Sequence, residues 1–224
     1  MKNDQHLQTH LVTRCLGLCA YQPILQQMKD FTQNRTSETP DELWYLEHTP
    51  VFTQGQTGRQ KHILDPGNIP IVHSDRGGQI TYHGPGQLII YLLCDLRRKH
   101  LGIKAFIEKI QETVIILLDT YDITATAHPN SPGIYVADQK ISSLGFRIRR
   151  GCAYHGISLN VDMDLTPFTR INPCGYPNLK MVQLSDFDIH DDIFTVTNKL
   201  VKILKKTLIY TQNNDNDVIK GNFT

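Results

Sequence analysis

The segment Ile171–Pro177 places a single thiol in a turn that the chain cannot avoid. Pro173 fixes the backbone just before Cys174, and Gly175 frees it just after. Pro177 prevents a helix or a central strand from running through. The segment therefore predicts a stiff loop with Cys174 at its tip, and a nucleophile must be aimed in this way before it can be activated. A lone cysteine is more often a small buried apolar residue, so the rest of the sequence must decide.

Lys140 is the candidate that would activate this thiol. It stands at the head of a strand-like run, where a lysine is more often a solvated charge at the edge of a sheet. The runs around it predict a meander that can place Lys140, His155 and Cys174 close together, although spacing alone does not require it. Beside Cys174, an ammonium favours the thiolate and lowers the cysteine pKa from about 8.5. A Cys–Lys pair then resembles the Ser–Lys variant of nucleophile and base.

The densest unusual segment is Arg76–Gln87, which holds four glycines and one proline in twelve residues. Glycines let the backbone approach a ligand closely, and Arg76, Tyr82 and His83 add a cation and two polar-tipped rings. The alternative interpretation is two tight turns around a short strand. The segment lacks the G-K-[ST] of a P-loop and does not match G-x-G-x-x-G, so it is no nucleotide-binding motif.

Composition limits the class of protein. Of 224 residues, 40% are hydrophobic and 20% are charged, and the formal net charge of +1 does not favour nucleic-acid binding. The five cysteines contain no C-x-x-C pair and the ten histidines no H-E-x-x-H, so we expect neither a disulfide framework nor a bound metal. The polar N-terminus is no signal peptide, and the longest apolar run, Leu88–Cys94, is too short to span a bilayer. We expect a cytoplasmic protein.

Hydrophobic periodicity predicts strands grouped with helices between them. The runs 134–137, 141–148 and 153–161 predict an antiparallel meander, and residues 54–68 predict a long surface loop. The other expected elements are strands at 7–19, 42–48, 69–73 and 87–96 and helices at 21–34, 105–121 and 191–208. The pattern predicts an α+β fold with a mixed α/β sheet. We expect a single catalytic domain over residues 1–212 and a polar, disordered tail over 213–224.

Four segments carry a family resemblance: Arg76–Gln87 (RGGQITYHGPGQ), Lys140–Gly145 (KISSLG), Tyr154–Asn160 (YHGISLN) and Ile171–Tyr176 (INPCGY). In this order they resemble the signatures of the bacterial octanoyltransferases of lipoate biosynthesis, the lipoyl(octanoyl) transferases. The resemblance extends from about residue 11 to residue 185, with no departure at a motif position. It implies the catalytic fold shared with the biotin and lipoate protein ligases.

The resemblance implies a two-step acyl transfer without a cofactor. Cys174 would attack the octanoyl thioester of acyl carrier protein and hold the octanoyl group as a thioester intermediate. A specific lysine on an apo lipoyl domain, in 2-oxoacid dehydrogenase complexes or the glycine cleavage H protein, would then take it as an amide. Lys140 would lower the pKa of Cys174 and shuttle protons. The implied substrate-binding residues are Arg76, Gly77, Gly78, Gln79, Ile80, Thr81, Tyr82, His83, Ser143, Leu144, Gly145, Gly156, Ile157 and Ser158.

The chemistry of the residues agrees with this implication. Transfer from a thioester to an amide is downhill, so ATP is not required. Phosphopantetheine and the acceptor lysine are both long arms, which favours an open-ended tunnel, and Leu144, Phe146 and Ile157 are candidates for apolar walls that select medium chains. An acidic carrier protein could meet one of two basic clusters, although each singly is more often a solvated strand end. The clusters are Arg147, Arg149 and Arg150, and Arg97, Arg98 and Lys99.

Two other functions stay open. An ATP-dependent lipoate or biotin ligase on the same fold predicts adenylate formation and has no use for Cys174. A non-catalytic module that binds lipoyl domains or acyl carriers would keep the fold alone, and the intact Cys174 and Lys140 speak against it. For each function we expect a monomer without nucleic-acid or membrane partners.

Overall fold

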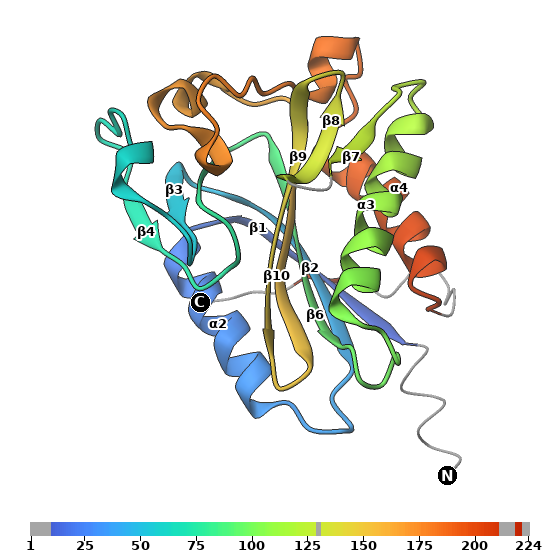
Figure 1. Ribbon diagram of the computed structural model, residues 1–224. Helices are drawn as coiled ribbons and strands as arrows, with labels where there is room; N and C mark the ends of the chain where they lie inside the picture. The colour runs from blue at the N-terminus through green and yellow to red at the C-terminus, as the bar shows by residue number, and fades with distance from the viewer. Residues whose placement is uncertain (1–9, 129–130, 211–217, 221–224) are drawn as a thin grey trace.

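Two sheets form the framework of the protein (Figure 1), whose computed structural model describes residues 10–128, 131–210 and 218–220. The main sheet has eight strands in the order β11-β1-β2-β6-β10-β9-β8-β7, and the small sheet has three in the order β4-β3-β5. The main-sheet strands are β1 (Leu11–Cys19), β2 (Asp41–His48), β6 (Gln87–Asp95), β7 (Thr126–His128), β8 (Ser131–Val136), β9 (Gln139–Arg149), β10 (Cys152–Asn160) and β11 (Val218–Lys220). The small sheet contains β3 (Val51–Gln54), β4 (Ile71–His73) and β5 (Ile80–His83).

The main sheet is mixed. β1 pairs in parallel with β2 and β11, and the other neighbouring strands pair antiparallel. The predicted meander is confirmed, because β8, β9 and β10 follow one another and pair antiparallel. Arg150 and Gly151 make the tight turn between β9 and β10 with φ angles of 52° and 77°. The predicted mixed α/β sheet in one domain is thus confirmed.

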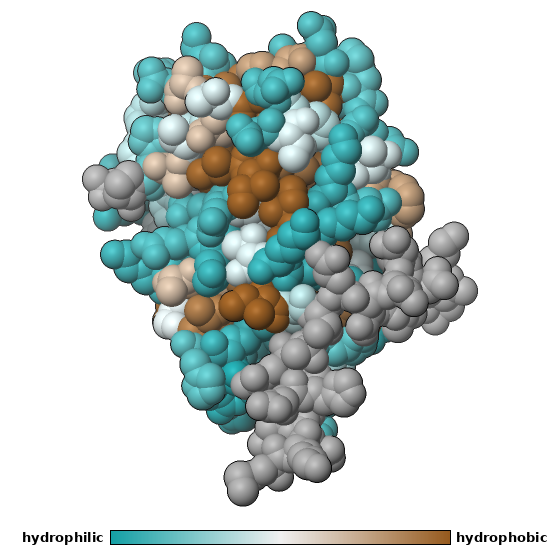
Figure 2. All heavy atoms as spheres, turned by 90° about the vertical axis from the view of Figure 1, so that its right-hand side faces the viewer, coloured by the Kyte–Doolittle hydropathy of each residue, from teal (hydrophilic) through white to brown (hydrophobic). Residues whose placement is uncertain are grey.

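Helices cover both faces of the main sheet (Figure 1): α2 (Tyr21–Asn34) lies on one face, and α3 (Ile103–Asp119) and α4 (Ile193–Thr207) lie on the other. All nine residues of β6 and of β10 are buried, as expected for strands covered on both faces. Figure 2 shows apolar side chains gathered on the face that α3 and α4 turn outward. The exposed large apolar residues of these two helices are Ile103, Ile116 and Phe194.

The expected surface loop over residues 54–68 is wrong in two respects. Its first residue ends β3, and the short 3₁₀ turn η1 (Gln60–His62) lies inside it. Backbone N–H groups of Gly55, Gln56 and Thr57 donate to carbonyls of residues 76–79, so this segment braces the glycine-rich one. β3 was missed from the sequence because of Pro50, since a proline next to a short apolar run usually indicates the end of a strand.

One short strand is described near the C-terminal end of the chain. Three residues of the expected tail, Val218–Lys220, pair with β1, and the rest of residues 213–224 lie outside the described residues. Among the helices that the structure describes, none has the length and apolarity needed to cross a membrane.

Candidate active site

Cys174 lies in the 3₁₀ turn η3 (Pro173–Gly175), with its backbone in the left-handed region at φ 55° and ψ 15°. A residue with a side chain is strained there, and the conformation persists only where the surroundings impose it. Two hydrogen bonds close the turn: Gly175 N–H donates to Asn172 O at 2.9 Å, and Tyr176 N–H donates to Pro173 O at 3.0 Å. This is the stiff loop that the prolines and the glycine predicted.

The small sheet and its loops hold the turn in place. Asn172 N–H donates to His62 O at 2.8 Å, and Ile171 forms a β-bridge with Ile63. Ile171 is also buried in an apolar cluster with Phe52 of β3. The small sheet and its loops therefore position Cys174, and the side chain that contacts its thiol comes from the main sheet.

That partner is Lys140, at the start of β9 in the main sheet. Its N–H donates to Lys180 O at 2.9 Å, and its carbonyl accepts from Val182 N–H at 3.0 Å, so the segment after the Cys174 turn pairs with β9. Lys140 is 1% exposed, and its Nζ lies 3.0 Å from Cys174 Sγ. Gly133 makes room for the lysine stem, because a Cβ there would lie 2.1 Å from Lys140 Cε. A solvated edge charge is therefore the wrong interpretation of this lysine.

Charge explains why the buried lysine remains an ammonium. Burial opposes its charge, but the Cys174 thiolate and the Tyr135 side chain outweigh burial and raise the pKa of Lys140. Arg76 is a second cation near the thiol: burial lowers the pKa of Arg76, against the opposing effects of Tyr21 and Cys174. Two cations thus lie near the thiol, and only the lysine can also release a proton.

A cavity of about 370 Å³ opens beside this pair. Its lining contains Cys174 and thirteen of the fourteen substrate-binding residues that the resemblance implies: Arg76, Gly77, Gly78, Gln79, Ile80, Thr81, His83, Ser143, Leu144, Gly145, Gly156, Ile157 and Ser158. Tyr82 is the exception. Its ring packs 5.5 Å from the rings of both Phe52 and Phe168, because neighbouring residues of β5 face opposite sides. Lys140 does not line the cavity either, and its Nζ contacts Cys174 Sγ from outside the lining.

The sequence matches the Lipoyl protein ligase A/B catalytic domain over residues 21–205. The chain belongs to this family. It is 53% identical over 206 residues to an octanoyltransferase from Vibrio vulnificus (strain YJ016), and the match covers 92% of this chain and 94% of the relative. The resemblance to the octanoyltransferases is therefore confirmed, and the chain is an acyltransferase of lipoate biosynthesis.

Solved structures of a lipoate-protein ligase and of a biotin protein ligase share the fold. A lipoate-protein ligase A bound with ATP matches with a TM-score of 0.74 and 17% identity, covering 93% of this chain and 90% of that one. A biotin protein ligase from Aquifex aeolicus matches with a TM-score of 0.55 and 13% identity, covering 88% and 68%. The expected ligase fold is confirmed.

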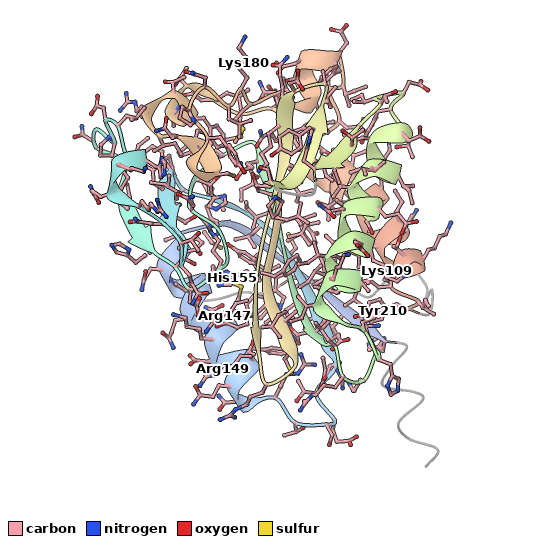
Figure 3. The ribbon with its side chains drawn as sticks, viewed as in Figure 1. Lys109, Arg147, Arg149, His155, Lys180 and Tyr210 are labelled. Carbon is pink, nitrogen blue, oxygen red and sulfur yellow. The ribbon has the colours of Figure 1, made fainter. Side chains whose placement is uncertain are left out.

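His155 does not join the Lys140–Cys174 pair. It pairs with Phe146 in β9, six residues beyond Lys140. Figure 3 shows His155 well separated from Lys180, whose carbonyl holds the backbone of Lys140. His155 is 1% exposed and lines the cavity with φ 62°, while its Nε2–H donates to Asp75 Oδ1 at 2.8 Å. Burial outweighs Asp75 and lowers the pKa of His155, so the ring is neutral.

The cavity is also lined by residues outside the four sequence motifs. They are Tyr21 of α2, Thr57, Ile89 and Tyr91 of β6, Ile103 and Ile107 of α3, Ser131 and Pro132 of β8, and Phe146 and Ile148 of β9. Tyr91 Oη donates to His48 Nε2 at 2.7 Å, and burial lowers the pKa of His48 to about 4. One signal was available in the sequence, because Tyr91 brings the single hydroxyl into the apolar run Leu88–Cys94.

The described ranges contain no group of three or more histidine, cysteine, aspartate or glutamate side chains able to hold a metal ion. The chemistry that this site offers is that of a thiolate, an ammonium and a mostly apolar cavity. Such a set suits acyl transfer, in which a thiolate takes a carbonyl group and a nearby acid–base residue moves protons.

Proposed function

We propose that this acyltransferase moves the octanoyl group from octanoyl-acyl carrier protein to a specific lysine of apo lipoyl domains, through a thioester on Cys174. The observation that carries the proposal is the contact of 3.0 Å between Lys140 Nζ and Cys174 Sγ beside a cavity with apolar walls. The buried ammonium favours the thiolate, and the cavity can hold a medium acyl chain.

In the first step, the Cys174 thiolate attacks the thioester carbonyl of the donor. A bond forms between Sγ and the carbonyl carbon, and the bond to the pantetheine sulfur breaks. Lys140 gives its proton to the leaving pantetheine thiolate and becomes a neutral amine. Burial, which opposes the charged form of Lys140, helps this release once the thiolate charge has been consumed.

In the second step, the acceptor lysine loses one proton to solvent and attacks the acyl-Cys174 carbonyl as an amine. The new C–N bond forms, the C–S bond breaks, and Cys174 returns as a thiolate. Neutral Lys140 takes the second proton from the attacking nitrogen and regains its charge beside the thiolate. Because a thioester is exchanged for an amide, the cycle needs no ATP and no cofactor.

The proposed acceptors are lipoyl domains of 2-oxoacid dehydrogenase complexes and the glycine cleavage H protein. The family description supports lipoyl proteins as the class of acceptor. All five cysteines are free thiols, which supports the proposed cytoplasmic location. We propose that the enzyme acts as a monomer.

For the carrier protein we propose the cluster Arg147, Arg149 and Arg150, which lies on and just after β9, the strand whose Phe146 and Ile148 line the cavity. Figure 3 shows Arg147 and Arg149 in a row along this strand. The alternative cluster is engaged within the chain: Arg97 and Arg98 pair with Asp95 and Asp41 at 2.8 Å and 2.6 Å. Lys99 Nζ lies 3.4 Å from the centre of the Tyr210 ring.

The test is to mix the pure protein with octanoyl-acyl carrier protein, without ATP or acceptor, and to measure its intact mass. One octanoyl adduct that maps to Cys174 and disappears when an apo lipoyl domain is added is the expected result. An adduct or product that forms only with octanoate and ATP would identify a ligase. A stable complex without any change of mass would identify a binding module.

A further inference from the structure

The backbone N–H groups of the two residues after Cys174 already donate hydrogen bonds within the turn. Acyl-transfer enzymes usually stabilise the developing oxyanion with backbone N–H groups, often that of the residue after the nucleophile. Here Gly175 N–H donates to Asn172 O at 2.9 Å, and Tyr176 N–H donates to Pro173 O at 3.0 Å. These two groups close the turn, so neither can serve the carbonyl oxygen of a bound thioester without opening it. The oxyanion must be met by another donor.

Gln79 presents a side-chain amide at this place. It lines the cavity together with Cys174, and it packs so closely on Gly175 that a Cβ there would lie 2.4 Å from Gln79 Nε2. Gly175 has φ 81° and carries no side chain, which keeps the space for this amide. The glutamine is thus in contact with the residue that directly follows the nucleophile.

The backbone of Gln79 is held in place, while the oxygen of its side-chain amide has no hydrogen-bond partner among the described residues. Arg76 Nη2 and Gly55 N–H both donate to the backbone carbonyl of Gln79, at 2.8 Å and 3.2 Å, and β5 begins at the next residue. Gln79 Oε1 is buried without a hydrogen-bond partner within the part of the chain that the structure describes.

We propose that Gln79 Nε2 donates a hydrogen bond to the thioester carbonyl oxygen and stabilises the oxyanion of both transfer steps, an inference that rests on the proposed function. Lys140 does not compete for this role, because its Nζ contacts Cys174 Sγ and must give up a proton to the leaving group. The two residues divide the work. Lys140 controls the charge and the protons, and Gln79 binds the charge that develops on oxygen.

Two reactions of the same thiol separate these roles. Alkylation by iodoacetamide needs the thiolate but forms no oxyanion, whereas acylation by octanoyl-acyl carrier protein needs both. Gln79→Met keeps the length of the side chain and removes the donor. Its single-turnover acylation rate should fall by about 10²–10³-fold, the usual effect of losing one oxyanion donor, with the alkylation rate unchanged. Gln79→Ala should behave in the same way, and both variants are checked for an unchanged melting temperature.

Two further variants complete the test. Gln26→Ala, an exposed glutamine on α2, is the matched control and should keep both rates. Thr81→Val tests a rival, because Thr81 also lines the cavity with a buried, unpartnered Oγ1 among the described residues.

Three results would overturn the inference: a Gln79→Met enzyme that acylates at nearly the wild-type rate, a parallel loss of alkylation, or a loss of acylation in Thr81→Val instead. Failure of the wild type itself to form an adduct on Cys174 would overturn the proposed function, and this inference with it.

Discussion

Two ionisable pairs, Lys140–Cys174 and Asp75–His155, lie at the same cavity. The buried base is charged in the first pair and neutral in the second. Lys140 and His155 are both 1% exposed, and each has one acidic partner. The Cys174 thiolate outweighs the burial of Lys140 and raises its pKa, so the lysine stays charged. Asp75 does not outweigh the burial of His155, whose pKa is lowered, so the histidine stays neutral.

The difference shows what makes one pair reactive. At the Cys174 side of the cavity, here called the mouth, the cation Lys140 is buried and its partner thiol lines the cavity. The deep end is the buried cluster of Tyr21, His48, His83, Tyr91 and His155, whose rings lie against one another. There the negative charge sits on Asp75, whose side chain is 27% exposed. The proposed activation therefore requires the buried ammonium beside the thiol, whereas the Asp75–His155 pair holds a neutral ring.

The largest expected effect concerns the thiol at the mouth. Cys174→Ala should give no octanoyl adduct and no transfer, because the deep end contains no nucleophile. Burial raises the pKa of Cys94 to about 12 and raises that of Cys152, so both remain poorly reactive thiols. Intact-mass measurement and peptide mapping after exposure to donor check this, with Cys152→Ala as the control that keeps the adduct. An adduct on Cys94 or Cys152 would contradict the prediction.

The next effect separates the charge of Lys140 from its proton. Lys140→Arg keeps a cation beside Cys174 but cannot release a proton in a protein. Alkylation by iodoacetamide below neutral pH should therefore persist, provided that the guanidinium fits beside Gly133. Acyl transfer should fall by about a hundredfold or more, the usual contribution of a positioned acid–base group. Lys140→Ala should lose both properties.

The outcomes for Lys140 are separable. Transfer at nearly the wild-type rate in Lys140→Arg would show that the lysine is only a charge, and the two pairs would then differ in sign alone. Unchanged alkylation in both variants would show that Lys140 does not activate Cys174.

The reactive end was predictable from sequence because its residues carry local signals. Proline and glycine around Cys174 required a turn, and Lys140 stood at a break between two strand-like runs. Strand order then followed from short connections, since consecutive antiparallel strands pair with one another. What the sequence could not give was the burial of Lys140, which depends on the space left by Gly133 on the neighbouring strand.

The deep end was not predictable, because its residues come from separate elements. Tyr21 begins α2, His48 ends β2 and Tyr91 lies within β6, and no local pattern links them. The meander allowed His155 to lie near Cys174, but the register of β10 on β9 pairs it with Phe146 instead. Register fixes such distances, and periodicity alone does not reveal it.

A smaller effect tests the neutrality of the deep end. Burial lowers the pKa of His48 to about 4 and that of His83 to about 3, from about 6.5 when unfolded. Between pH 6.5 and pH 4 the unfolded chain thus binds protons that the folded chain does not, and the free energy of unfolding should fall as pH falls. Each histidine contributes up to about 1.4 kcal/mol per pH unit. Urea denaturation across this range measures the slope.

Two variants test whether the pH dependence of the free energy of unfolding comes from the deep end. His48→Gln should reduce it, because one buried neutral histidine no longer titrates in the unfolded chain alone. His190→Gln, on an exposed histidine, should leave it unchanged. A free energy of unfolding that stays constant from pH 6.5 to pH 4 would mean that the deep end accepts protons without cost, and the contrast with Lys140 would fail.

The smallest effect of a single change is the loss of one methylene from the acyl chain, which tests the preference of the cavity for chain length. Leu144, Phe146 and Ile157 line it, and Phe146 is fixed by an edge contact of 5.1 Å between ring centres with Phe106. Each buried methylene contributes about 0.8 kcal/mol, so kcat/KM should fall roughly fourfold for each methylene removed from octanoyl. Donors on one carrier protein, from butanoyl to palmitoyl, measure this series.

Longer chains decide whether the polar deep end limits the cavity. Residues 155–158 of β10 all line the cavity, and three residues of a strand span about 10 Å, which is comparable with an extended eight-carbon chain. A longer chain would press methylenes against the polar ring of His155, so kcat/KM should stop rising beyond octanoyl. Phe146→Ala widens the apolar wall and should favour longer chains by a few-fold. Equal rates for butanoyl, octanoyl and palmitoyl donors would show that neither the apolar walls nor the deep end measures the chain.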